Sequence, residues 1–243
     1  FAAIPENRTR NGKAFLGIII PNKLTRELAE DIGIHIGDGS LYRCNSKRSS
    51  FQFTYSSNIN ETDYVDYIIK LKKYLYNLTK FRVYKKRRKE YYLSFNSLAI
   101  STFYNSVLKI PVGTKVYSIH VPKLIKESED KEIIASFIRG LVDTDFGLSF
   151  KNRYGKIYPV LMGGFASYNL VKDLSELFNF LGIKHALRFN ISKKDKRLDK
   201  SYLLNTIEIN GFDRIYNYVK IIGFSNPKNI RKWARRDLNS RSL

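Results

Sequence analysis

Cysteine, histidine and long apolar runs are all scarce in this chain of 243 residues. Cys44 is the only cysteine, which excludes a disulfide framework and a cysteine-based zinc site. The histidines His35, His120 and His185 lack the spacing of metal ligands. The apolar run at 17–20 is too short to span a bilayer, and the sequence shows neither a signal peptide nor a glycine-rich phosphate loop. We therefore expect an intracellular protein that is neither membrane-spanning nor an NTPase.

Acidic residues are few relative to basic ones. Lys and Arg number 43 against 22 Asp and Glu, which gives a formal net charge of +21. Such an excess predicts a polyanionic partner, most often a nucleic acid. An anionic membrane surface is the rival partner, and the lack of a long apolar segment disfavours it. Apolar residues make up 43% of the chain, which is enough for a sizeable core.

The stretch from Leu24 to Leu41 is the segment around which we expect the chain to be organised. Leucine and isoleucine recur every four residues there, which predicts a helix. Ala29, Gly33 and Gly37 form a second row with the same spacing, and small residues in such a row let another backbone come close. Because glycine inside a helix costs about 1 kcal/mol relative to alanine, the row indicates a packing contact. The helix ends at Asp38, whose charge is unfavourable at the negative end of the helix dipole.

The same pattern returns once in the second half of the chain. Ser136, Gly140 and Thr144 form the row of small residues, and Asp145 takes the place of Asp38 at the same offset. Two helices that each carry such a row of small residues most naturally pack on each other through these rows. Their ends then bring both carboxylates together, at a place that we call the seam. Divalent cations would relieve the repulsion between the carboxylates. Two ordinary core helices that end in Asp-containing turns are the alternative, and the repetition favours a functional site.

Each half of the chain repeats one order of elements. In the first half, the motif helix precedes strands at 41–48 and 51–55, a helix at 62–78, strands at 81–84 and 91–95 and a helix at 97–108. In the second half, the second motif precedes strands at 148–153 and 158–165, a helix at 170–181, strands at 183–189 and 202–209 and a helix at 211–222. A basic helical segment at 228–243 ends the chain. We therefore predict an α+β fold of two pseudo-symmetric αββαββα repeats. The predicted divisions are an N-terminal extension at 1–22, a first repeat at 23–122 and a second at 123–243.

The two motifs resemble those of the LAGLIDADG homing endonucleases in their single-chain form, and the resemblance covers residues 23–235. It implies a monomer whose two four-stranded antiparallel sheets form a saddle for double-stranded DNA, with the motif helices packed at the interface. It also implies that Asp38 and Asp145 bind two or more Mg²⁺ ions at their shared seam, together with the main-chain carbonyls of Gly37 and Thr144.

Two departures from the family pattern lie in the motifs themselves. Ile36 replaces the acidic residue that is usual in the first copy, while Asp143 keeps it in the second. Phe146 falls where the second motif normally has glycine, and Gly147 comes one place late. The second change alters the turn after the helix but leaves the Asp145 carboxylate in place.

The resemblance implies metal-dependent hydrolysis of one phosphodiester in each strand, across the minor groove of a long target site. The product would be a double-strand break with short 3′ overhangs. A nearby basic residue often stabilises the developing charge in such sites. Lys115 and Lys228 each follow the last helix of their half at matching places, which makes them the candidates. Two solvated loop lysines are the alternative, and the sequence favours neither interpretation.

DNA contacts are expected on exposed strands and hairpin tips, because two-stranded ribbons fit the major groove. The candidates are Tyr42, Arg43, Lys47, Arg48, Gln52, Tyr55, Arg82, Tyr84, Lys85, Lys86, Arg87, Arg88, Lys151, Arg153, Lys156, Tyr158, Arg188, Lys193 and Lys194. The basic cluster at 80–89 lies on a predicted hairpin and favours phosphate contact. Gln52 has the chemistry for bidentate recognition of adenine.

Two other functions remain open at the level of sequence. The same fold can serve as an RNA-splicing maturase or as a non-cutting DNA-binding module, and basic strands would also suit RNA. Asp38 and Asp145 together favour cutting, because binding alone needs neither carboxylate. A transcriptional regulator is a weaker alternative, since the sequence lacks a helix-turn-helix with a convincing recognition helix.

Overall fold

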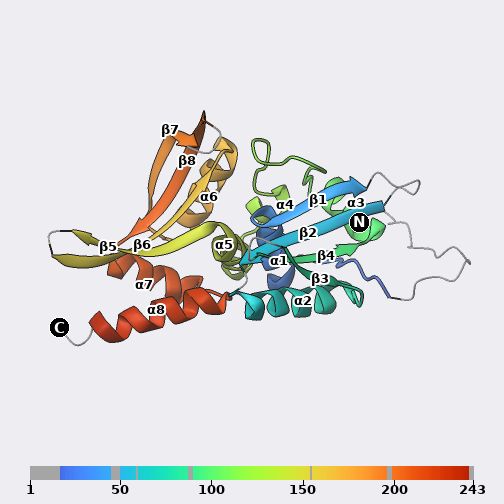
Figure 1. Cartoon of the computed structure of the whole chain (residues 1–243), viewed down its shortest axis with the longest axis horizontal. Helices are drawn as coiled ribbons and strands as arrows, with labels where there is room; N and C mark the ends of the chain where they lie inside the picture. The colour runs from blue at the N-terminus through green and yellow to red at the C-terminus, as the bar shows by residue number, and fades with distance from the viewer. Residues whose placement is uncertain are drawn as a thin grey trace, which may run out of the picture.

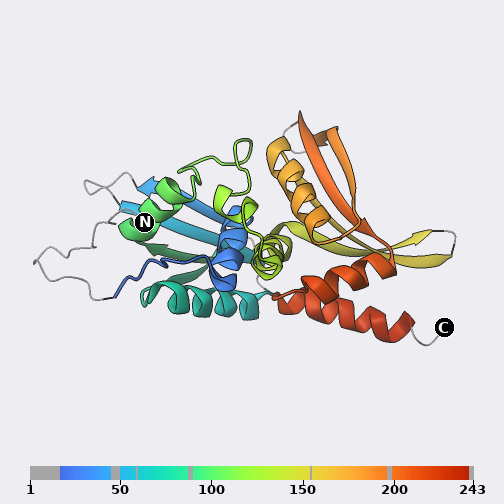
Figure 2. The ribbon, with the colours of Figure 1, turned by 180° about the vertical axis from the view of Figure 1, so that it is seen from behind.

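The computed structural model describes residues 17–44, 50–58, 60–86, 90–153, 155–195 and 199–240. Two halves, each with a four-stranded antiparallel sheet, lie on either side of a central pair of helices (Figures 1 and 2). The predicted α+β fold with two pseudo-symmetric halves is confirmed. None of the described helices combines the length and the apolar character that a membrane span requires.

The N-terminal half follows the predicted order of elements. It contains α1 (Arg26–Ile36), β1 (Gly39–Cys44), β2 (Ser50–Asn58), α2 (Thr62–Tyr76), β3 (Arg82–Lys86), β4 (Glu90–Asn96), α3 (Leu98–Thr102) and the π-helical turn η1 (Phe103–Val107). Its sheet has the order β1-β2-β4-β3. Side-chain caps fix two helix starts: the Thr25 hydroxyl accepts a hydrogen bond from the Leu28 N–H, and the Ser97 hydroxyl accepts one from the Ile100 N–H, both at 3.2 Å.

The C-terminal half repeats this order. It contains α4 (Lys123–Lys126), α5 (Lys131–Asp145), β5 (Phe146–Arg153), β6 (Lys156–Phe165), α6 (Tyr168–Phe180), β7 (Ala186–Asp195), β8 (Lys200–Asn210), α7 (Phe212–Ile221) and α8 (Pro227–Ser240). Its sheet has the matching order β5-β6-β8-β7. β7 begins later than predicted because Gly182, with φ of 70°, ends α6, and the Ile183 N–H then bonds to the Phe178 carbonyl at 2.8 Å.

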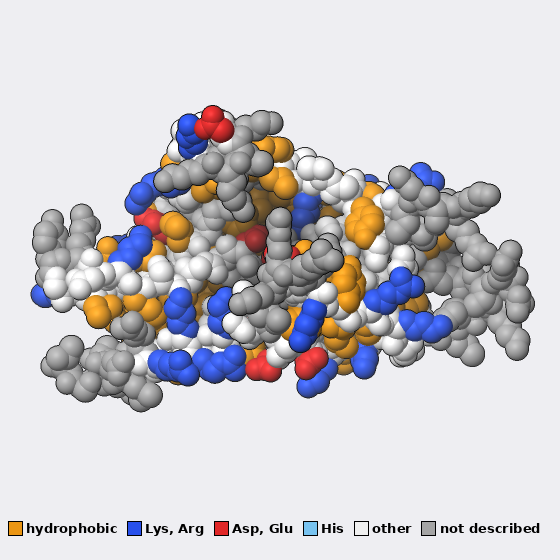
Figure 3. Space-filling view, in the orientation of Figure 1, with side chains coloured by type: hydrophobic (Ala, Val, Ile, Leu, Met, Phe, Trp, Pro, Cys, Tyr) orange, Lys and Arg blue, Asp and Glu red, His pale blue; other side chains and the backbone are white. Residues whose placement is uncertain are grey.

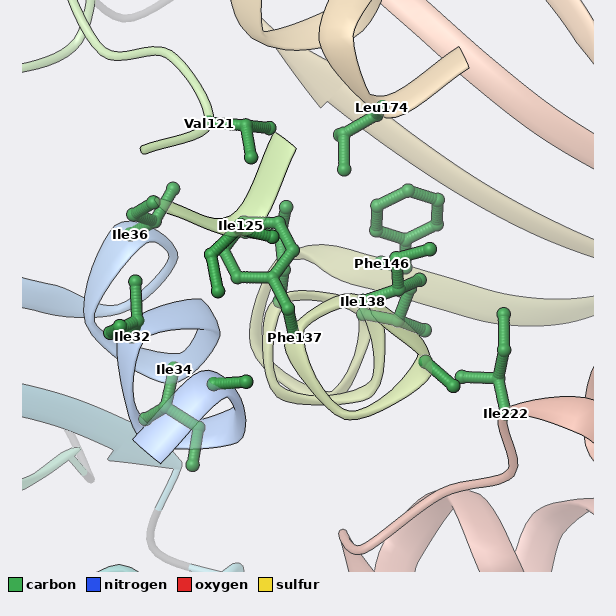
Figure 4. Close-up of a cluster of buried hydrophobic side chains, with 14 of the residues drawn as sticks. Ile32, Ile34, Ile36, Val121, Ile125, Phe137, Ile138, Phe146, Leu174 and Ile222 are labelled. Atoms are coloured by element: carbon green, nitrogen blue, oxygen red, sulfur yellow. The ribbon is translucent and has the colours of Figure 1, made fainter. Parts of the chain in front are cut away.

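One hydrophobic core runs through both halves and centres on α1 and α5. Ile32 and Ile36 of α1 and Phe137 of α5 are buried in it, as the close-up shows (Figure 4). Ile125 of the short helix α4, which the sequence did not predict, is fully buried beside them (Figure 4). The core therefore holds the two motif helices at the interface of the halves, as predicted.

α1 and α5 touch backbone to backbone. A Cβ atom added to Gly33 would lie 2.1 Å from the carbonyl oxygen of Phe137, and one added to Gly140 would lie 2.2 Å from that of Glu30. These distances are far below any real Cβ contact, so a side chain cannot be accommodated without a shift of the backbone. Each glycine therefore contacts a carbonyl of the other helix that lies about one turn before the glycine of that helix. The contact is the same in both directions, so it has pseudo-two-fold symmetry.

Replacing either glycine by alanine should force the two helices apart. We expect Gly33→Ala and Gly140→Ala each to lower the free energy of unfolding by about 1–3 kcal/mol, as overpacking of a dense core does, when measured by denaturant unfolding. This loss would appear although alanine is the better helix former. Gly147→Ala is the matched control, because a Cβ there meets no atom within 4 Å. Variants as stable as this control would contradict the close contact.

Candidate active site and nucleic-acid interface

Two carboxylates meet where α1 and α5 end. Gly37 leaves the helical conformation at the end of α1, and Asp38 follows it directly, whereas α5 continues to Asp145. Gly37 lies against Thr144 at this end of the pair, and a Cβ on Gly37 would lie 3.2 Å from Asp145 Oδ2. Helix packing thus places the Asp145 carboxylate beside the end of α1.

The surroundings of both carboxylates disfavour their charged forms. Burial and the charges of Asp145 and Glu61 raise the pKa of Asp38 to about 8, although Lys115 and Lys228 act in the opposite direction. Burial raises the pKa of Asp145 to about 6, against the attraction of Lys115. Asp145 reaches solvent on one side, while the protein around its other sides leaves the carboxylate poorly solvated. A cation bound beside both groups would favour their charged forms.

Lys115 supplies a compensating positive charge at the end of α1. Its ammonium donates hydrogen bonds to the carbonyl oxygens of His35, Ile36 and Gly37 at 2.5, 2.5 and 3.0 Å. Carbonyls at a helix C-terminus have no partner within the helix, and a cation there also offsets the helix dipole. Burial lowers the pKa of Lys115 to about 8, against the attraction of the two carboxylates. Lys115 therefore lies at the seam and is held in a fixed position.

Lys228 is held differently, despite its matching place in the second repeat. Its side chain is 57% exposed, and its ammonium lies 3.2 Å from Glu61 Oε1. The side-chain amide of Asn226 donates to the same Glu61 oxygen at 3.1 Å. Glu61 precedes α2 and belongs to neither motif, so no sequence pattern indicated that it would lie near Asp38. The lysine of the second half is thus paired with an acid of the first half.

Asp143 anchors the segment that carries Lys228. Its buried carboxylate accepts hydrogen bonds from the main-chain N–H groups of Ser225 and Asn226 at 2.5 and 2.9 Å, and from the Asn229 side-chain amide at 2.9 Å. Burial raises the pKa of Asp143 to about 7, although these three hydrogen bonds lower it. Asp143 therefore has an architectural role and faces away from the carboxylate seam toward α8.

The donors at the seam suit a hard divalent cation. Carboxylate and carbonyl oxygens are the ligands that Mg²⁺ and Ca²⁺ prefer. Among the predicted main-chain ligands, the Gly37 carbonyl already accepts a hydrogen bond from Lys115. Within the described ranges, no cluster of three or more His, Cys, Asp or Glu side chains could hold a metal ion. A cation held by Asp38 and Asp145 would complete its shell with water and phosphate oxygens, which Mg²⁺ readily accepts.

The outer face of the N-terminal sheet carries several of the predicted DNA contacts. Tyr42 of β1 lies opposite Gln52 of β2, and its hydroxyl donates to Gln52 Oε1. Tyr84 of β3 stacks on Tyr92 of β4 with ring centroids 5.6 Å apart, and Arg82 is exposed on the same face. In Figure 1 both sheets lie in front of α3 and α6, so the space-filling view of Figure 3 looks onto these outer faces.

Tyr55 is a wrong prediction, because it does not reach this face. Residues of a strand alternate between the two faces, and Tyr55 shares the core face of β2 with Phe53. Tyr55 is 2% exposed, and its hydroxyl lies 2.9 Å from His35 Nδ1. Lys85 likewise lies on the opposite side from Tyr84, with its ammonium 5.2 Å from the ring centroid of Tyr91. The exposed Arg43 alternates with Tyr42 in the same way.

A bulge in β7 decides which basic residues of the C-terminal sheet face outward. The register shifts after Arg188, where Asn190 has φ of 55°. Beyond the bulge, Lys193 pairs with Tyr202 and returns to the face of Arg188, while Lys194 lies on the opposite face. Lys194 is ion-paired with Asp199 at 2.7 Å, and Arg188 with Glu208 at 2.9 Å. Of the remaining candidates, Lys151, Lys156 and Tyr158 lie on β5 and β6, where Lys151 is opposite Tyr158.

Six of the predicted DNA contacts have side chains that the structure does not describe. Lys47, Arg48, Arg87 and Arg88 lie outside the described residues, as do the side chains of Lys86 and Arg153. Their contacts with phosphates stay predictions.

Comparisons by sequence find no relatives: no family model matches the chain, and no curated protein does. Solved structures do match. The crystal structure of I-DmoI in complex with DNA and Mn has a TM-score of 0.55 at 20% identity, and the match covers 84% of this chain and 99% of that one. The LAGLIDADG homing endonuclease I-GzeII in complex with its DNA target has a TM-score of 0.54 at 14% identity, with 90% and 92% covered. This chain has the LAGLIDADG homing endonuclease fold. The resemblance carried by the two motifs is thereby confirmed at the level of the fold.

The raised pKa of Asp38 makes the stability of this LAGLIDADG fold pH-dependent when no metal is present. Between about pH 4 and pH 8 the folded chain keeps a proton on Asp38 that the unfolded chain has lost, so this residue contributes a loss of stability as pH rises. Asp38→Asn cannot ionise. We therefore expect its melting temperature, measured in a chelator, to exceed that of the native chain increasingly between about pH 4 and about pH 8.

The matched control is Asp66→Asn, which removes an exposed carboxylate of α2. A gain in melting temperature that this control shares with Asp38→Asn would not come from the seam. Mg²⁺ should raise the melting temperature of the native chain at high pH more than that of Asp38→Asn, because a ligand stabilises only the form that binds it. A difference between Asp38→Asn and the native chain that is independent of pH would contradict the electrostatic account of the seam.

Proposed function

We propose that the chain is a metal-dependent endonuclease that cuts both strands of a long DNA target site, one phosphodiester per strand, across the minor groove, and leaves short 3′ overhangs. One observation carries the proposal: Asp38 and Asp145 meet at the ends of two packed, pseudo-symmetric helices, and Lys115 lies beside both. One chain with two halves would act as a monomer. I-DmoI, which has this fold, has been crystallised with DNA and Mn and with DNA and Ca.

The residues of the seam would have different roles in the reaction. Asp38 and Asp145 would hold Mg²⁺, with the main-chain carbonyls of Gly37 and Thr144 as further ligands. When bound, the cation lowers the pKa of water and neutralises charge on the leaving oxygen. Lys115 is mostly protonated at neutral pH, since its pKa is about 8. Because three carbonyls fix its ammonium, its charge is in place to stabilise the negative charge that grows on the phosphate in the transition state.

The outer faces of the sheets would hold the duplex on both sides of the seam. Tyr42, Gln52, Arg82 and Tyr84 would contact DNA on the N-terminal sheet, and Lys151, Lys156, Arg188 and Lys193 on the C-terminal sheet. Antiparallel ribbons fit the major groove, where the edges of the bases differ most. A net charge of +21 supports strong, salt-dependent attraction to phosphates.

Asp38→Asn and Asp145→Asn should separate catalysis from binding. Both changes keep the shape of the side chain and remove the charge that holds the metal. We expect each to suppress cutting of both strands or to leave mainly nicks, while affinity for duplex is kept or rises, because a negative charge facing the phosphates is gone. A cleavage gel and a binding titration measure the two properties. Both use a plasmid that carries the insertion site of the chain's own gene, without the insert.

Ca²⁺ should support binding with poor cleavage in the same assay, because its looser geometry positions water badly. Asp66→Asn again serves as the control and should cut like the native chain. Cutting by both seam variants at the native rate in Mg²⁺ would show that the assignment is wrong. A native chain that binds duplex tightly yet never cuts would instead support the non-cutting alternatives, an RNA-binding maturase or a DNA-binding module.

The two lysines of the seam should differ in their contribution to cutting. Lys115 is half-buried and held by three carbonyls, whereas Lys228 is largely exposed and paired with Glu61. We expect Lys115→Met to slow single-turnover cleavage by about 10²-fold or more, the effect of losing one pre-positioned donor, and Lys228→Met to slow it much less. Because Lys115→Met also uncaps α1, rates are compared well below its melting temperature. Equal losses in the two variants would contradict this asymmetry.

A further inference from the structure

α8 has two chemically different sides. Its basic residues recur at spacings of three and four, so they share one side of the helix. Together with two residues from elsewhere they line a cleft of about 470 Å³: Asn60, Phe150, Lys228, Arg231, Lys232 and Arg235. Four of these six side chains are cationic, and none carries a carboxylate. The cleft therefore favours an anion.

The other side of α8 fixes the helix to the protein. Trp233 is 8% exposed and packs against Phe212 and Tyr216 of α7, with ring centroids 6.3 and 5.2 Å apart. Asn229 donates to the buried Asp143 carboxylate at 2.9 Å. Because both contacts are made before any partner binds, little conformational freedom of the helix is left to lose on binding.

α8 begins at the seam and runs outward along the edge of the C-terminal half (Figures 1 and 2). In Figure 3, which looks onto the outer faces of both sheets, Lys and Arg side chains follow this lower edge. Lys228, at the start of the helix, is near enough to Asp38 to act on its charge. A duplex that crosses the seam and lies on the C-terminal sheet would continue beside α8.

Two of the four cations form ion pairs with acids of the first half, Lys228 with Glu61 and Arg231 with Asp63. Arg231 lies 3.3 Å from Asp63 across the two halves, and both side chains are more than half exposed. Exposed pairs of this kind contribute little to stability, so a phosphate can displace Asp63. The competing interpretation is a solvated helix face, in which case neutralising these cations would not affect binding.

We propose that the cationic side of α8 binds the sugar–phosphate backbone of duplex DNA, as a third contact surface beyond the two sheets. The inference rests on the proposed function, because a duplex held across the seam is what brings phosphates to this helix. In the first half, the segment after Lys115 forms turns and the short helix α4 instead. This surface should therefore lengthen the stretch of DNA that the protein covers, and only at the end that lies on the C-terminal sheet.

The double variant Lys232→Gln with Arg235→Gln tests the proposal and leaves Lys228 intact. Its affinity for a random-sequence duplex and for the target plasmid fragment is measured across a salt series in Ca²⁺. We expect affinity to fall about tenfold or more at low salt, and the slope of log K against log salt to become shallower by about 0.9 per lost phosphate contact. Hydroxyl-radical footprinting should show lost protection at one end of the footprint.

The matched control is Lys172→Gln with Lys220→Gln, which removes the same charge from exposed positions on α6 and α7. Equal loss of affinity in both double variants, at unchanged melting temperatures, would mean that overall charge is responsible and would overturn the proposal. So would an α8 variant that keeps its affinity for duplex but loses affinity for structured RNA. A native chain that binds no duplex at all would refute the proposed function itself, which is a distinguishable result.

Discussion

The structure depends on one contact, the close approach of α1 and α5 at Gly33 and Gly140. A Cβ at either position would come within about 2 Å of a carbonyl oxygen of the other helix, so only glycine allows this separation. Each helical glycine costs about 1 kcal/mol, which burial of both helices in a common core offsets. The contact also sets the position of everything attached to the helices. It fixes the two sheets on either side and brings Asp38 and Asp145 to one seam.

Bringing the carboxylates together creates an electrostatic cost that the fold removes only in part. Lys115 satisfies three carbonyls at the end of α1 and attracts both carboxylates. Even so, the pKa of Asp38 stays at about 8 and that of Asp145 at about 6. The metal-free seam therefore tends to retain protons. The same field that holds protons on these oxygens would also favour a divalent cation, which would displace the protons as it binds, so its affinity should rise with pH.

Local, repeated patterns were predictable from the sequence, and features created by tertiary contact were not. The rows of small residues and the two motif carboxylates lie within single helices, so their spacing was enough to predict both the packing and the seam. Glu61 comes near Asp38 only because α2 begins there, and no motif marks it. The sequence did indicate that Tyr55 is buried, since it lies two residues from the apolar Phe53 and shares its face of the strand. No pattern in the sequence indicated that Lys193 faces outward, because its orientation follows from a bulge in β7.

The two halves share a fold but are held by different interactions. In the first, Asp31 forms a fully buried ion pair with Lys72, at 2.7 and 2.9 Å, and hydroxyl groups complete its partners. In the second, the buried carboxylate of Asp143 fixes α8, and the positions that match Asp31 and Asp143 in the other half are both isoleucine. The lysines of the seam differ likewise, because Lys115 is half-buried and Lys228 is exposed. A symmetric dimer presents the same surface twice and suits a palindromic site. Under the proposed function, a single chain whose halves differ in this way would suit a target whose two half-sites differ.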